Sequence, residues 1–187
     1  MSNPAQVIVL AEDTRQTRLV KAWVRRRRPD LSPSVIRVRP MAQGRGGGAQ
    51  RVLDNYEPEV RAHLMRHASK WLIVVIDADN ETVARRLDQL AEKLKASDDE
   101  RVKKCRVERE QIARLVPKWS VETWILCLNG EAVDEQTRYK TRNRDWDGGI
   151  TPAAVEFDNW QRNPQNLPDR FVPSLQHGIE ELRRLTL

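Results

Sequence analysis

The chain contains little cysteine and little histidine, with two and three copies in 187 residues. Cys105 and Cys127 are too few for a disulfide framework or a cysteine-based zinc site, and no CxxC or HExxH motif is present. Because cytoplasmic thiols stay reduced, this composition favours a cytoplasmic protein. The sequence also lacks an apolar run long enough to cross a membrane and has no charged-then-apolar leader, so we expect no membrane partner.

Positive charge exceeds negative charge, with 33 lysines and arginines against 27 acidic residues and a net charge of +6. Such a balance favours a polyanionic partner, and we expect nucleic acid, with DNA favoured over RNA. The length predicts one catalytic domain, residues 1–130, and an extension, residues 131–187, packed on the same domain. A homo-oligomer is left open.

Two segments, residues 7–11 and 71–76, are apolar at every position. Such segments indicate strands buried on both faces of a parallel sheet that helices cover. Shorter extended segments at 34–40, where apolar and basic residues alternate, and at 112–116 predict an edge strand and a fourth strand. With helical spacing between them, the order is βαβαβαβα. The sequence therefore predicts an α/β fold with a mainly parallel sheet of about four strands sandwiched by helices.

Several helix boundaries can be predicted from capping residues and proline. We expect Asp13 or Thr14 to cap the first helix and Asp79 or Asn80 to cap the third. Pro58 is expected to mark a kink or a fresh start in the second helix.

The C-terminal extension is polar and interrupted from residue 129 to residue 170. There we expect only a short helix, opened by Thr151 and Pro152, followed by an amphipathic helix over residues 174–187. Trp146 and Trp160 lie in this polar region, where they are available to stack on bases or to bury against a partner.

Acidic residues directly follow both fully apolar strands. Glu12 follows the first, and Asp77 and Asp79 follow the other. The carboxyl ends of parallel strands meet at the edge of the sheet where α/β proteins place their sites. Because residues i and i+2 of a strand point to one side, Asp77 and Asp79 are expected to converge on a cation, joined by Glu12 if the strands are neighbours. Glu122, in the first turn of a later helix, is either a ligand of a second ion or only a favourable helix charge.

These carboxylates suit Mg²⁺ or Mn²⁺ and the hydrolysis of phosphodiester bonds. Glu12 is expected to bind metal or to move a proton, and Asp77 and Asp79 to hold the ion. Lys118 and Arg15 are expected to contribute positive charge toward the transition state, and Arg15 is also expected to bind the nucleic acid.

A glycine-rich segment at residues 44–48 is a candidate phosphate-binding loop. Arg45, Gly46 and Gly47 could bring a charge and backbone N–H groups to a nucleic-acid phosphate. The segment lacks the Lys-Ser/Thr ending of a nucleotide P-loop, so we do not expect an ATP site. A flexible connection is the alternative interpretation.

These acids follow the pattern of a known superfamily. Glu12 after the first strand and Asp77-Ala78-Asp79 after a later one resemble the TOPRIM fold, the metal-dependent module of topoisomerases, primases, small ribonucleases and OLD-type nucleases. Residues 117–124, which include Glu122, are similar to the later acidic motif of RloB-like bacterial defence proteins. The resemblance covers residues 5–130. It implies a TOPRIM-like, Mg²⁺-dependent endonuclease, the effector of an anti-phage system, beside a separate ABC- or OLD-type ATPase.

One position departs from the family pattern, because Asp13 stands where a glycine usually follows the first glutamate. Either Asp13 joins the site or the site has drifted toward inactivity. A topoisomerase is not expected, since 187 residues leave no room for a strand-passage body and neither Tyr56 nor Tyr139 lies in a nucleophile context. Two alternatives stay open: a phosphatase or phosphotransferase acting on a small phosphate ester, and a non-catalytic interaction subunit.

Overall fold

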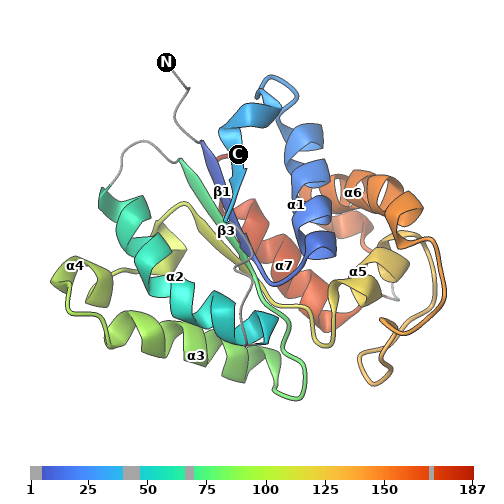
Figure 1. Ribbon diagram of the computed structural model, residues 1–187. Helices are drawn as coiled ribbons and strands as arrows, with labels where there is room; N and C mark the ends of the chain where they lie inside the picture. The colour runs from blue at the N-terminus through green and yellow to red at the C-terminus, as the bar shows by residue number, and fades with distance from the viewer. Residues whose placement is uncertain (1–5, 40–46, 66–69, 169–170) are drawn as a thin grey trace.

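Four parallel strands form the centre of the fold in a computed structural model of the chain (Figure 1). The residues described are 6–39, 47–65, 70–168 and 171–187. The strands are β1 (Val7–Ala11), β2 (Ile36–Val38), β3 (Trp71–Val75) and β4 (Ile112–Leu115), in the order β2-β1-β3-β4. Every pairing is parallel. The α/β prediction is confirmed.

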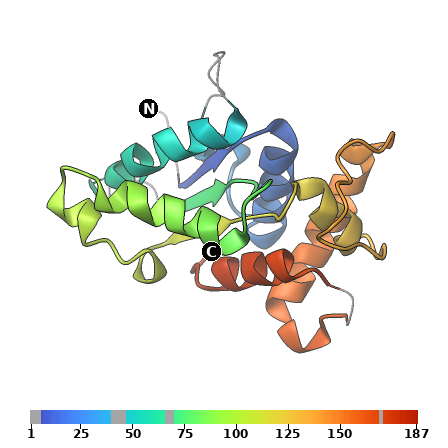
Figure 2. The ribbon, with the colours of Figure 1, turned by 90° about the horizontal axis from the view of Figure 1, so that it is seen from below.

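Helices cover both faces of this sheet (Figures 1 and 2). One layer contains α2 (Gly48–Met65), α3 (Val83–Lys95) and the short α4 (Glu100–Lys103). The other contains α1 (Thr14–Arg27), α5 (Val121–Leu128), α6 (Trp146–Arg162) and α7 (Pro173–Arg183). Short 3₁₀ turns lie at Pro33–Val35, Val107–Arg109 and Pro164–Asn166. No helix in the described part of the chain is both long and apolar enough to traverse a bilayer.

The sheet separates two hydrophobic cores because successive strand residues point to opposite faces. In β3, Ile73 and Val75 join the core under α1, α5, α6 and α7, whereas Leu72 and Val74 join the core under α2 and α3. This explains why β3 is apolar throughout.

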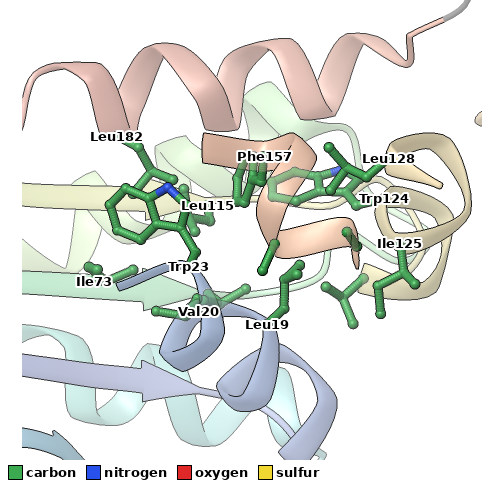
Figure 3. Close-up of a cluster of buried hydrophobic side chains, with 14 of the residues drawn as sticks. Leu19, Val20, Trp23, Ile73, Leu115, Trp124, Ile125, Leu128, Phe157 and Leu182 are labelled. Atoms are coloured by element: carbon green, nitrogen blue, oxygen red, sulfur yellow. The ribbon is translucent and has the colours of Figure 1, made fainter. Parts of the chain in front are cut away.

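The larger core is built around aromatic side chains from three helices (Figure 3). Phe157 lies 6.3 Å from Trp23 and 5.9 Å from Trp124, measured between ring centroids. The indole N–H of Trp23 donates to Gln161 Oε1 at 2.9 Å, and Gln161 Nε2 donates to the Leu182 carbonyl at 3.0 Å. The polar atoms of Trp23 and Gln161 are therefore paired within this core, as burial requires.

The C-terminal region departs most from the sequence prediction. Helix α6 begins at Trp146, before the expected start at Thr151, and continues through Pro152. Asp145 caps it by accepting a hydrogen bond from the N–H of Gly148. Trp146 and Trp160 are buried in the larger core, so they are not free to stack on bases. Apolar residues of α6 recur at helical spacing, and their burial outweighs the local polarity on which the shorter prediction rested.

The capping predictions are partly correct. Asp13 caps α1, since its carboxylate accepts from the N–H of Gln16 at 2.9 Å. Thr82, and neither Asp79 nor Asn80, caps α3. Helix α2 continues through Pro58 without a fresh start. The edge strand β2 forms only over Ile36–Val38, because a 3₁₀ turn precedes it.

Candidate functional site

Glu12 and Asp77 meet at the carboxyl edge of the sheet. Their strands are neighbours, with Ala11 paired to Val75, so the residues that follow each strand emerge side by side. The Oε1 atom of Glu12 accepts a hydrogen bond of 2.7 Å from the backbone N–H of Asp77. The structure therefore brings the Glu12 carboxylate to the backbone of Asp77, while their convergence on a cation stays a prediction.

Gln16, in the first turn of α1, joins these two acids. Its Nε2 donates to Asp77 Oδ1 at 2.8 Å, and its Oε1 accepts from the Glu12 backbone N–H at 2.8 Å. The side chain is fully buried. In the sequence, Gln16 stands one helical turn beyond Glu12. Nothing in that spacing indicated that Gln16 belongs to the site.

Burial and neighbouring carboxylates raise the pKa of both acids. The pKa of Glu12 rises from 4.5 to about 7, chiefly because burial disfavours its charged form, while the hydrogen bond from Asp77 opposes the rise and Asp79 adds to it. The pKa of Asp77 lies well above its usual range, again first through burial and then through the charge of Glu12. Carboxylates gathered out of water in this way favour a proton or a cation among them.

Asp79 lies apart from the extended backbone that its prediction assumed. Strand β3 ends at Val75, and Asp79 adopts a φ of 53°, in the left-handed region that aspartate tolerates better than most residues. Its side chain is exposed, although its charge still acts on Glu12 and Asp77. Strand alternation therefore does not direct the Asp79 side chain toward that of Asp77. For both carboxylates to bind one ion, the turn itself would have to bring Asp79 close to Asp77.

Lys118 holds that turn in place. Its Nζ donates to the backbone carbonyls of Asp79 and Glu81 at 2.8 and 2.6 Å. The ammonium also lies 4.2 Å from the ring centroid of Trp119. The charge predicted to face the reacting group is thus engaged with backbone oxygens beside the site.

Glu122 is fully buried at the start of α5 and pairs with Arg15. The distance from Arg15 Nη1 to Glu122 Oε1 is 2.5 Å. Arg15 therefore compensates a buried carboxylate, while its own side chain stays partly exposed. The second oxygen, Oε2, is buried and has no hydrogen-bond partner among the described residues. Within the described residues, the protein thus engages only one oxygen of this carboxylate.

A lysine distant in the sequence lies among the acids. Lys140 belongs to residues 131–145, which link α5 to α6 and which we call the strap (Figure 1). Its Nζ lies 3.7 Å from Asp13 Oδ2. Burial lowers its pKa, but the charges of Asp13, Glu122, Asp77 and Glu12 raise it to a larger extent. The ammonium therefore lies next to Asp13 and within the electrostatic field of the other three carboxylates, and no motif in the sequence pointed to it.

The glycine-rich segment lies only partly within the described residues. Arg45 and Gly46 fall outside them, and Gly47 is exposed just before α2. Gly48 opens α2 against Glu12: a Cβ at Gly48 would lie 2.9 Å from the Cβ of Glu12. Arg51, one turn later, donates to the carbonyls of Ala11 and Glu12 at 2.9 and 2.6 Å. The start of α2 thus holds Glu12 in place.

The carboxylates of this site can be compared with the ligands that a hard dication needs. Carboxylate oxygens are its preferred protein ligands, and Glu12 and Asp77 supply them next to each other. Glu122 adds a buried oxygen without a partner. Within the described residues no set of three or more His, Cys, Asp or Glu side chains is already arranged to hold one ion. The residue types fit a magnesium ion with few protein ligands and several waters.

Comparison with protein-family models, with curated proteins and with solved structures finds no match for this chain. The TOPRIM relationship therefore stays a prediction from the motifs around Glu12, Asp77 and Glu122.

Proposed function

We propose that the protein is a divalent-metal-dependent nuclease that hydrolyses phosphodiester bonds of nucleic acid, using Mg²⁺ or Mn²⁺. One observation carries the proposal: Glu12 and Asp77, at the ends of adjacent parallel strands, are joined by a hydrogen bond at the carboxyl edge, and burial and neighbouring carboxylates raise the pKa of both. Such perturbed acids at a strand-end site are typical of functional residues.

The roles of the side chains follow from their positions. Glu12 and Asp77 would hold the ion, with Gln16 orienting Asp77 and Arg51 orienting the Glu12 backbone. When bound, such an ion polarises a phosphoryl oxygen and lowers the pKa of a coordinated water. Glu12, with a pKa of about 7, is suited to accept a proton near neutral pH whenever it is not a ligand.

The cellular role is part of the same proposal and is supported only by the motif resemblance. We propose a cytoplasmic effector of bacterial anti-phage defence that acts beside a separate ABC- or OLD-type ATPase. Neither a P-loop nor another ATPase motif was found in the sequence, so ATP hydrolysis would belong to the partner.

The test compares Asp77→Asn with a matched exposed aspartate, Asp88→Asn on α3. Cleavage of labelled DNA and RNA is measured with Mg²⁺ or Mn²⁺, and ion binding by calorimetry. We expect Asp77→Asn to abolish cleavage and to weaken ion binding at least tenfold, while Asp88→Asn retains both. Unlabelled mononucleotides and small phosphate esters serve as competitors, and hydrolysis of these in preference to polymer would favour the phosphatase alternative.

A second candidate function is nucleic-acid binding without hydrolysis. It is favoured by the engagement of the acids in hydrogen bonds within the protein, above all the pairing of Glu122 with Arg15 and of Asp77 with Gln16. Binding of nucleic acid that is identical in wild type and Asp77→Asn, with no cleavage by either protein in any divalent ion, would establish this function in place of the nuclease.

A further inference from the structure

The strap carries basic residues at every second position beside the acids. They are Arg138, Lys140, Arg142 and Arg144, and all four are exposed. Tyr139, between the first two, is buried, and its hydroxyl accepts from the N–H of Asp134 at 3.1 Å. The alternation therefore directs the charges outward while an aromatic anchor fixes the segment from within.

Contacts with the strand-end edge hold the strap in place. The indole N–H of Trp119 donates to the Glu135 carbonyl at 2.9 Å, and the Glu135 carboxylate accepts from the N–H of Ser174 at 2.8 Å. Arg138 donates to Asn80 Oδ1 at 2.6 Å and lies 4.2 Å from the centroid of the Trp119 ring. The strap is thus tied to the turn after β3, to the start of α5 and to α7.

The charges of the strap are not fully neutralised within the described residues. Arg144 pairs with Glu131, and Lys140 faces Asp13 at 3.7 Å. Arg138 bonds to a neutral amide, and Arg142 lies against the Tyr139 ring, with no ion pair to either arginine among the described residues. Two exposed guanidinium groups and one ammonium are therefore available to an anion beside the carboxylates.

We propose that the strap binds the sugar-phosphate backbone of nucleic acid and leads it to the acids, with Arg138, Lys140 and Arg142 as the phosphate contacts. The inference rests on the proposed nuclease function, whose substrate must bring a phosphate to Glu12 and Asp77. Lys140 has a particular place in it, since among the described residues it alone of the three pairs with a carboxylate, that of Asp13 at 3.7 Å, next to Glu12 in the sequence. If Lys140 bound a phosphate in place of Asp13, that phosphate would be held next to the acids.

The structure also indicates how the nucleic acid is recognised. Proteins that bind the bases of single-stranded nucleic acid present aromatic rings on which these bases stack. In the described part of the chain, Met65 is the only exposed large hydrophobic residue. The half-buried Trp119 ring already contacts the charged groups of Lys118 and Arg138, so it is not free to stack on a base. Recognition through the backbone charge alone predicts binding that is independent of base sequence and strongly dependent on salt.

The test measures binding separately from cleavage. Fluorescence anisotropy of labelled duplex DNA, single-stranded DNA and RNA is recorded in EDTA over a series of salt concentrations. The variant is K140A/R142A, and the matched control is R25A/R26A, which removes two exposed charges at the far end of α1. We expect K140A/R142A to bind roughly tenfold more weakly and to lower the salt slope by about two. The control is expected to behave as the wild type, and two oligonucleotides of unrelated sequence are expected to bind alike.

The outcomes separate the two proposals. Equal losses in K140A/R142A and in the control would overturn the strap proposal and leave the nuclease proposal intact. Wild-type affinity in K140A/R142A would overturn it as well, whether or not Asp77→Asn abolishes cleavage. A selective loss in K140A/R142A supports the strap proposal, even if wild type cleaves nothing and the nuclease proposal fails. Failure of the wild type to bind any of the three nucleic acids would end both.

Discussion

The backbone N–H of Asp77 donates a 2.7 Å hydrogen bond to Oε1 of Glu12. This bond joins the ends of β1 and β3 and fixes the Glu12 carboxylate against the backbone of Asp77. It lowers the pKa of Glu12, but burial and the neighbouring acids outweigh it and leave that pKa at about 7. The folded protein without metal therefore retains a proton on Glu12 that the unfolded chain would release at a lower pH.

The stability of the metal-free protein is predicted to fall as the pH rises from about 4.5 to about 7. Between these values unfolded Glu12 is ionised and folded Glu12 is still protonated, so the unfolded state binds fewer protons and each pH increment favours unfolding. Asp77, whose pKa is also raised, acts in the same direction. We expect Glu12 to contribute roughly 2 kcal/mol to the loss, with its partial exposure reducing the full effect. Urea unfolding in EDTA at several pH values measures it.

Glu12→Gln is the matched variant for this pH dependence. Its side-chain oxygen can still accept the hydrogen bond from Asp77, while the ionisable group is removed. We expect a flatter pH profile and a higher stability than wild type near pH 8 without metal. A profile as steep as that of the wild type would show that Glu12 does not carry the dependence.

Gly48 is predicted to be required for the position of Glu12. A Cβ at Gly48 would lie 2.9 Å from the Glu12 Cβ, whereas a Cβ at Gly47 would meet nothing within 4 Å. Gly48→Ala is expected to cost about 1–3 kcal/mol of stability through overpacking and to weaken Mg²⁺ binding, whereas Gly47→Ala leaves both nearly unchanged. Chemical unfolding and calorimetry distinguish them, and equal behaviour of the two variants would contradict the predicted contact.

A second glycine is predicted to set the packing of two helices. A Cβ at Gly178 of α7 would lie 2.5 Å from Cη2 of Trp124 in α5. The better helix propensity of alanine, about 1 kcal/mol, would offset only part of this overlap. We expect Gly178→Ala to destabilise the protein by about 1–2 kcal/mol, measured by urea unfolding. Gln176→Ala, at an exposed position of the same helix, serves as the control and should remain within about 0.5 kcal/mol of wild type.

The fold was more predictable than the site for a physical reason. The uninterrupted apolar segment that forms β3 requires two covered faces, and this requirement determines a layered α/β arrangement from local sequence alone. The juxtaposition of Glu12 with Asp77 follows from the same sheet. Lys140 and Gly48 could not be found in this way, since their proximity to the acids depends on how the strap and the start of α2 return to the edge.

Asp79 and Trp146 show where local patterns mislead. The spacing of Asp79 from Asp77 indicates a shared side only while the backbone stays extended, and a φ of 53° breaks that condition. Trp146 lies in a polar stretch of sequence, yet α6 packs it into the core. Turn geometry decided the first case. In the second, the helical spacing of the apolar residues in α6 outweighed the local polarity.

The pair of Arg15 and Glu122 yields an asymmetric prediction. Glu122 is fully buried, whereas the Arg15 side chain is 36% exposed, so an arginine left alone can be hydrated but a glutamate left alone cannot. Arg15→Ala is therefore expected to destabilise the metal-free protein by about 2–4 kcal/mol, and Glu122→Gln by clearly less. If Glu122 Oε2 binds a dication, Mg²⁺ should restore more stability to Arg15→Ala than it adds to wild type, because the ion replaces the lost positive charge. Urea unfolding of both variants with Mg²⁺ and with EDTA measures this difference, and equal Mg²⁺ effects in Arg15→Ala and wild type would assign Glu122 a structural role only.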